Sequence, residues 1–175
     1  MSTLRYPIVA DDHLLGNARA AVQLVEYGDY QCPYCGEAHL VVKELARRYG
    51  QQIAVVFRNF PLTDAHPEAL NAALVAEFAG TQGQFWAAHD TLYENQDQLG
   101  PELYGQIVAS LGTTADDFQQ AIDSGALEQR IRHDIDTGLR SGVNGTPCFF
   151  INGQRADLSS FDSLLDIVGQ RVART

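Results

Sequence analysis

The segment Cys32-Pro33-Tyr34-Cys35 holds the two side chains of this sequence that are best suited to chemistry. If the segment opens a helix, the two cysteines lie on one face with a rise of about 4.5 Å between them, so their thiols can form and break a disulfide without backbone movement. Cys32 then lies at the helix N-terminus, where unpaired N–H groups and the helix dipole favour a thiolate. Because the thiolate is the attacking species, we expect Cys32 to be the nucleophile and Cys35 to resolve the mixed disulfide.

Two other uses of the pair are open at this point. It fits half of a zinc site, which needs two further ligands, and the sequence offers only Cys148 and histidines such as His39. A structural disulfide without turnover is the second alternative, and a reducing compartment disfavours it. Three cysteines, an odd and small number, do not make a disulfide-stapled scaffold. We therefore expect no metal and no cofactor.

The elements that must position the pair are predicted from apolar periodicity. Residues 21–27 alternate with a period of two, which predicts a strand with Glu26 on its apolar face. Residues 33–49 have helical spacing, and the β-branched residues 53–60 predict a buried, parallel strand. Together they predict a β-α-β unit with the cysteine pair at the start of its helix.

The rest of the chain changes character twice. Residues 1–20 are expected to be an irregular lead-in, and residues 64–141 are helical throughout, with a capping-box pattern at Thr114 and Asp117. Strand periodicity then returns around the hairpin signal Asn152-Gly153, and a last helix follows.

The strands on either side of the helical run need each other to form a sheet. We therefore predict an α/β domain made of residues 1–63 and 142–175, with residues 64–141 as an inserted helical subdomain.

Four features together match one family. They are the helical insertion, the segment 25–35 that ends in the cysteine pair, the segment Phe57-Arg58-Asn59-Phe60-Pro61-Leu62, and Gly145-Thr146-Pro147. Over almost its whole length the chain resembles the DsbA-like branch of the thioredoxin superfamily, and it is similar to short DsbA-like proteins, some of them fused to sodium/proton antiporters. The resemblance implies a thioredoxin fold with an inserted helical subdomain, and thiol:disulfide exchange with protein or peptide thiols.

The resemblance also implies roles for residues outside the pair. Thr146-Pro147 matches the loop that holds a cis-proline beside the cysteines, where the backbone pairs with an extended substrate. We accordingly expect substrate contacts from Pro33, Tyr34, Thr146 and Pro147; the alternative is an ordinary loop proline. Glu26 matches a buried acid that accepts the proton of the inner cysteine, and burial would raise its pKa toward neutrality. The alternative is a surface glutamate.

Position 34 departs from DsbA itself, which has histidine there. Tyr34 supplies no positive charge to the thiolate, so the pair should be less oxidising, as a reductase or isomerase would be. The Cys-Pro-Tyr-Cys motif is also typical of dithiol glutaredoxins. The alternatives are therefore a glutathione-linked reductase of glutaredoxin type and a non-catalytic binding or regulatory module. Glutathione or a thioredoxin-type protein is the expected reductant.

Residues outside these motifs are given structural roles. Strand alternation turns Cys148 away from the side that Pro147 presents, which predicts a buried free thiol; a third redox cysteine is the alternative. We expect Trp86 and His89 to pack within the helical segment, and His133, Asp134 and Asp136 to lie on a solvated helix face.

The charge of the chain is acidic and unevenly distributed. Its 22 acidic and 12 basic residues give a net charge of −10, which argues against a phosphate backbone as partner, so we expect no nucleic-acid binding. Between Asp64 and Gly142 there are 13 acidic and three basic residues, so the helical segment carries the whole excess. The resemblance to DsbA-like proteins implies that this segment covers the cysteine pair. Our hypothesis is that its acidic charge opposes the helix dipole at Cys32 and steers cationic substrates toward the pair.

Apolar runs are short. No stretch approaches the ~18 apolar residues of a membrane span, and residues 1–10 lack the apolar run of a signal peptide. We expect no stable membrane insertion and a cytoplasmic location, or a periplasmic one if a signal peptide has been removed.

Overall fold

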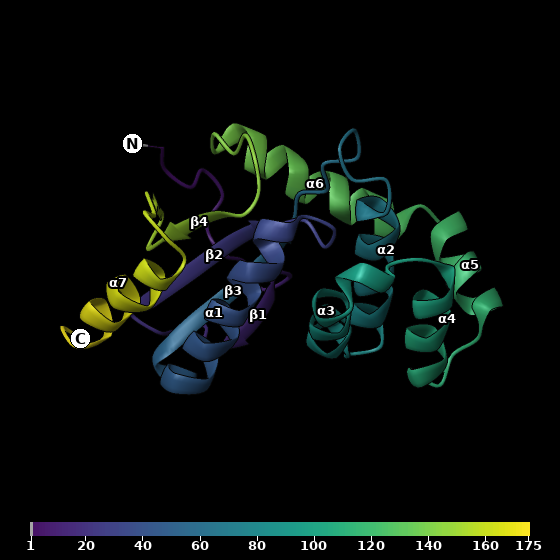
Figure 1. The fold of residues 1–175 in the computed structure, drawn as a ribbon, viewed down its shortest axis with the longest axis horizontal. Coiled ribbons are helices and arrows are strands. Elements are labelled where there is room, and N and C mark those ends of the chain that lie inside the picture. The colour runs from purple at the N-terminus through teal and green to yellow at the C-terminus, as the bar shows by residue number, and fades with distance from the viewer. Residues whose placement is uncertain (1) are drawn as a thin grey trace.

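A five-stranded sheet forms the centre of the computed structural model, which describes residues 2–175 (Figure 1). Its strand order is β1-β3-β2-β4-β5, with β2 and β3 parallel and the other neighbours antiparallel. The parallel pair is the predicted β-α-β unit, because parallel neighbours must be joined by a crossover. The strands are β1 (His13–Gly16), β2 (Val22–Gly28), β3 (Ile53–Asn59), β4 (Cys148–Ile151) and β5 (Gln154–Arg155).

The helices fall into two groups along the chain. Two of them flank the strands, namely α1 (Pro33–Tyr49), which is followed by the 3-10 helix η1 (Gly50–Gln52), and α7 (Asp162–Val172). The others lie between β3 and β4: α2 (Ala69–Thr81), α3 (Phe85–Glu94), η2 (Gln96–Gln98), α4 (Pro101–Ser110), α5 (Ala115–Asp123) and α6 (Ala126–Arg140). The predicted capping box begins α5, where Asp117 N–H donates to Thr114 Oγ1 at 3.1 Å and Thr114 N–H donates to Asp117 Oδ2 at 2.8 Å.

Helices cover both faces of the sheet. On one face, Val22 and Leu24 of β2 pack with α1 and α7, whose contributions include Leu45 and Leu164. On the other face, α6 packs over the aromatic side chains of Tyr27, Phe60 and Phe150. The close approach of α6 depends on Gly138, because a Cβ there would lie 2.9 Å from the Phe60 ring. One helix of the predicted insertion therefore completes the layered core.

Helices α2 to α5 gather beside the sheet edge formed by β1, as Figure 1 shows. Their apolar side chains form one cluster with Tyr30, Cys32, Cys35 and Phe57, so the core of the helical segment is continuous with the surroundings of the cysteine pair. The exact boundaries proposed for the subdomain, residues 64 and 141, stay a prediction.

The expectation for residues 1–20 is wrong, because they contain the edge strand β1. Leu14 of β1 pairs with Val56 of β3, and Leu15 pairs with Val55. A strand of four residues is too short to display an alternating pattern. Its partner lies beyond α1 in the chain, so tertiary pairing rather than local propensity determines it.

Candidate active site

The cysteine pair begins α1, as predicted. Cys32 is the N-cap residue in an extended conformation, and Pro33 occupies the first turn, where its missing N–H leaves no donor unsatisfied. The carbonyl of Cys32 accepts hydrogen bonds from the N–H groups of Cys35 at 3.0 Å and Gly36 at 3.2 Å. Both thiols are free, and they are buried, with 3% of Cys32 and 0% of Cys35 exposed.

The surroundings of Cys32 favour its thiolate. A hydrogen bond from the Cys35 side chain, helped by Thr146 and by the N–H groups of Cys35 and Tyr34, lowers the pKa of Cys32 to about 5 against the effect of burial. As a thiol, Cys32 Sγ donates to the Thr146 carbonyl at 3.5 Å. The Thr146 hydroxyl is buried and has no other partner among the described residues. It is therefore free to donate to the thiolate.

The inner cysteine has the opposite preference. Burial raises the pKa of Cys35 far above the range of an ordinary thiol, and its hydrogen bond to Cys32 and the charges of Glu26 and Cys32 add to this effect. The two sulfurs thus differ in protonation at neutral pH, with a thiolate on Cys32 and a thiol on Cys35.

Glu26 lies beneath the pair on β2, on the face that α1 covers. It is 2% exposed, and its neighbours across the sheet are Phe57 and Phe149. Its Oε1 has no hydrogen-bond partner among the described residues. Burial, together with the charge of Cys32, raises the pKa of Glu26 to about 8. The buried position expected for this residue is therefore present, and its carboxyl titrates near neutral pH.

A groove of about 360 Å³ opens next to the cysteine pair, and its lining includes Tyr34, Thr146 and Pro147. The Thr146–Pro147 peptide bond is cis. Tyr34 is 64% exposed, so its ring is available to a bound chain. Pro33 is exposed but does not line the groove. The structure thus brings together three of the four residues expected to contact substrate.

Two residues that the sequence did not single out hold the turn before Cys32. Gln96 of η2 donates through Nε2 to the carbonyls of Tyr30 at 2.7 Å and Cys32 at 3.0 Å. The Asp29 carbonyl accepts from Cys32 N–H at 3.1 Å. No local pattern could have identified Gln96, because it reaches the pair from a 3-10 turn of the insertion.

The side chain of Asp29 fixes the same turn from the other side. Its Oδ1 accepts from Gln31 N–H at 2.8 Å, and its Oδ2 accepts from Leu62 N–H at 2.8 Å and lies 2.8 Å from His66 Nδ1. An Asp whose carboxylate accepts from the N–H two residues further on is a local turn pattern, so this signal was present in the sequence.

Cys148 lies on the opposite face of the sheet from Glu26. It borders the groove, yet it is 4% exposed and packs with Tyr27 and Phe150 beneath α6. Burial raises the pKa of Cys148, which keeps it a thiol at neutral pH. The predicted buried free thiol is confirmed, and its redox behaviour stays a prediction.

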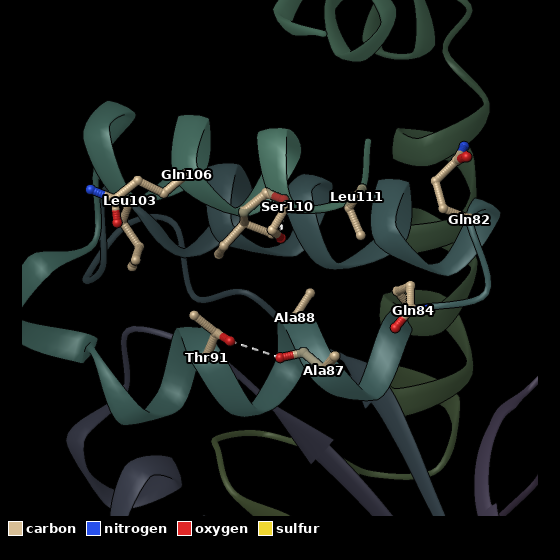
Figure 2. Close-up of a pocket in the computed structure, with 10 residues that line it drawn as sticks. Gln82, Gln84, Ala87, Ala88, Thr91, Leu103, Gln106, Ser110 and Leu111 are labelled. Atoms are coloured by element: carbon tan, nitrogen blue, oxygen red, sulfur yellow. Dashed lines mark hydrogen bonds between the residues drawn. The ribbon is translucent and has the colours of Figure 1, made fainter. Parts of the chain in front are cut away.

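A second hollow, of about 470 Å³, lies between α3 and α4 in the helical segment (Figure 2). The Thr91 hydroxyl in its wall donates to the Ala87 carbonyl at 2.8 Å within α3. The lining side chains are amides, hydroxyls and aliphatic groups, none of which titrates near neutral pH. The cysteine pair is therefore the better candidate for catalysis.

Comparison with known proteins supports the thioredoxin class, which the fold and the cysteine pair indicate. Residues 9–170 match the family model described as Thioredoxin, so the chain belongs to this family. The crystal structure of oxidised BdbD from Bacillus subtilis matches with a TM-score of 0.82 and 20% identity, over 98% of each chain. Alpha-DsbA1 from Wolbachia pipientis matches with a TM-score of 0.81 and 20% identity, over 95% of this chain and 94% of that one. The predicted DsbA-like thioredoxin fold with a helical insertion is confirmed.

The curated relatives with higher identity are larger proteins, and this chain matches only a part of each. The Na(+)/H(+) antiporter NhaA 3 of Salinispora tropica is 42% identical over 153 residues, which is 87% of this chain and 23% of the antiporter. The chain spans about a quarter of the length of the curated relatives it matches. Among residues 2–175, no helix has both the length and the apolar composition needed to cross a bilayer.

Proposed function

We propose that this protein is a thiol:disulfide oxidoreductase that acts on protein or peptide disulfides through Cys32 and Cys35. The observation that carries the proposal is the difference between the two sulfurs. The pKa of Cys32 is lowered to about 5, whereas that of Cys35 is raised. Cys32 is therefore a thiolate that can attack a disulfide at neutral pH, whereas Cys35 stays a thiol until the second step.

In the reducing direction, the Cys32 thiolate attacks one sulfur of a substrate disulfide. The bond from Cys32 to that sulfur forms, the substrate disulfide breaks, and the second substrate sulfur leaves as a thiolate. Cys35 then loses its proton and attacks Cys32 Sγ, which forms the Cys32–Cys35 disulfide and releases the first substrate sulfur. The substrate gains two electrons and the pair loses two, and the reverse sequence oxidises a dithiol.

Glu26 is the proposed proton acceptor for Cys35. Its charge contributes to the raised pKa of Cys35, so the two groups interact. A carboxyl with a pKa of about 8 can take up a proton near neutral pH, and its unpartnered Oε1 is free to do so.

The groove beside Tyr34, Thr146 and Pro147 is the proposed substrate site. Pro147 has no N–H, so the backbone of Thr146 can pair with an extended peptide, as an edge strand does. The carbonyl of Thr146 lies 3.5 Å from Cys32 Sγ, which would hold the substrate disulfide next to the nucleophile. Pro33 would contact substrate from the rim.

The test is reduction of insulin disulfides by the reduced protein and three variants. We expect Cys32→Ser to lose activity, Cys35→Ser to lose multiple turnover, and Cys148→Ser, the matched cysteine control, to retain wild-type activity. Full activity of Cys32→Ser would overturn the proposal. Untitrated cysteines in a folded, inactive wild type would favour the binding module instead.

The proposal also covers the preferred disulfide substrate and whether the pair reduces or oxidises it. A glutathione-linked reductase of glutaredoxin type should prefer a glutathione mixed disulfide to a protein disulfide, and we expect the opposite preference. The reduction potential of the pair would separate a reductase or isomerase from an oxidase. The cytoplasmic location stays a prediction. It would be tested by labelling the Cys32 thiol in intact cells with a reagent that cannot cross the membrane, which should leave a cytoplasmic protein unlabelled.

A further inference from the structure

Three metal-ligating side chains meet where α1 contacts α3. They are His39 of α1 and His89 and Asp90 of α3, and their ligand atoms lie within 4.8 Å of one another. All three line a hollow of about 210 Å³. The cluster is separate from the cysteine pair, although Cys35 precedes His39 by one helical turn.

An unsatisfied nitrogen points to a ligand. His39 is only 4% exposed, and its Nε2 has no hydrogen-bond partner among the described residues. The facing Oδ1 of Asp90 lies 3.8 Å away, which is too long for a hydrogen bond. Buried polar atoms are rarely left without a partner, and a bound cation between these two atoms would satisfy both.

His89 is oriented as a metal ligand usually is. Its Nδ1 lies 3.0 Å from the Tyr30 hydroxyl, which leaves Nε2 for a ligand. Metal-binding histidines commonly bond a fixed partner through their second ring nitrogen.

The ligand set selects a class of ion. Two imidazoles and one carboxylate suit Zn²⁺ and its transition-metal neighbours, whereas Ca²⁺ and Mg²⁺ require mostly oxygen ligands. Tetrahedral ligands of Zn²⁺ lie about 3.4 Å apart. The present spacing would therefore contract by up to about 1.4 Å around the ion, and the hollow has room for a water as the fourth ligand.

We propose that His39, His89 and Asp90 bind a divalent transition-metal ion of the Zn²⁺ class. The ion joins α1, which begins at the cysteine pair, to α3 of the helical segment. It differs from the sequence-based expectation of no metal, because the ligands come from two helices far apart in the sequence and have no motif spacing.

Lys43 competes for one of the ligands. Its ammonium lies 3.0 Å from Asp90 Oδ2 and also bonds to Glu94. Removing this charge should therefore tighten metal binding, whereas a site elsewhere on the surface would not respond.

The test uses the tag-free, oxidised full chain, in which Cys32 and Cys35 are bonded to each other and unavailable as ligands. Titration with Zn²⁺ alone should show one bound ion per chain, and a hundredfold excess over Kd should raise Tm by about 5–10 °C. His39→Gln and the half-exposed Asp90→Asn should each weaken binding by about tenfold or more. His133→Gln, an exposed histidine, is the control and should bind as the wild type does. No saturable binding, or equal affinity in all four proteins, would overturn the proposal.

Lys43→Met keeps the aliphatic stem and removes the charge. We expect it to bind Zn²⁺ several-fold more tightly than the wild type. An unchanged or weaker affinity would overturn the assignment of Asp90 as a ligand.

Discussion

The side-chain amide of Gln96 donates a hydrogen bond of 3.0 Å to the backbone carbonyl of Cys32. It also donates to the Tyr30 carbonyl at 2.7 Å, so one residue of the helical segment holds the turn that leads into the cysteine pair. Gly36 makes room for it, because a Cβ at that position would lie 2.2 Å from Gln96 Oε1. The helical segment thus supports the site directly as well as bordering it.

Gln96→Ala should loosen this turn. The loss of two hydrogen bonds is expected to lower the free energy of unfolding by about 1–3 kcal/mol and to slow disulfide exchange. Gln98→Ala removes an exposed glutamine from the same 3-10 turn and is the control. Denaturant unfolding and exchange kinetics check both effects. Equal behaviour of the two variants would show that the Gln96 contacts contribute nothing.

Alkylation of the reduced protein should depend on pH through Cys32. Because the pKa of Cys32 is about 5, its rate with iodoacetamide should be nearly constant above pH 6 and should fall as the pH drops through 5. Cys35 and Cys148 should stay unmodified at neutral pH, since burial raises the pKa of each thiol. Peptide mapping by mass spectrometry assigns the sites. A midpoint near the ordinary thiol pKa would contradict the proposed activation.

Glu26 should make the protein less stable as pH rises. Its folded pKa, about 8, is higher than its unfolded value, so the folded state binds more protons between these values. Its contribution to stability is therefore full at acidic pH and is lost as pH rises toward 8. In the oxidised protein, Glu26→Gln should gain stability relative to wild type by a few kcal/mol between pH 5 and pH 8.5. A stability difference that does not change with pH would rule out the buried carboxyl as its source.

The acidic charge should act on the choice of substrate. From Asn59 to Gln129 the chain has no Lys or Arg and 11 acidic residues, and this segment includes the helices that gather beside the pair. A basic disulfide peptide should react up to about tenfold faster than an acidic one at low ionic strength, and the difference should shrink at high salt. Stopped-flow rates at several salt concentrations measure it. Equal rates for both peptides at low salt would leave the acidic residues with a role in solubility alone.

The parts of the fold predicted well are those that local chemistry decides. Pro33 at the first turn of α1 and the Thr114–Asp117 capping box each mark a helix start regardless of tertiary context. Trp86 and His89 pack among aromatic rings in the helical segment, as expected.

The failures have tertiary causes. Asp134 was expected on a solvated face, but it is 1% exposed and accepts from Asn59 N–H at 2.9 Å. Strand β3 supplies that partner, so the surroundings of Asp134 depend on packing that its own helix does not reveal. The contacts of Gln96 have the same kind of cause. They join segments that are far apart in the sequence and carry no common motif.

The most direct test of the central claim is to trap the reaction halfway. Cys35→Ser, mixed with a peptide that contains one disulfide, should form a covalent mixed disulfide, because Cys32 can attack and no second thiol can resolve the product. Mass spectrometry of the digested adduct should locate the peptide on Cys32. An adduct on Cys148, or no adduct from the folded variant, would contradict the assignment of Cys32 as the nucleophile.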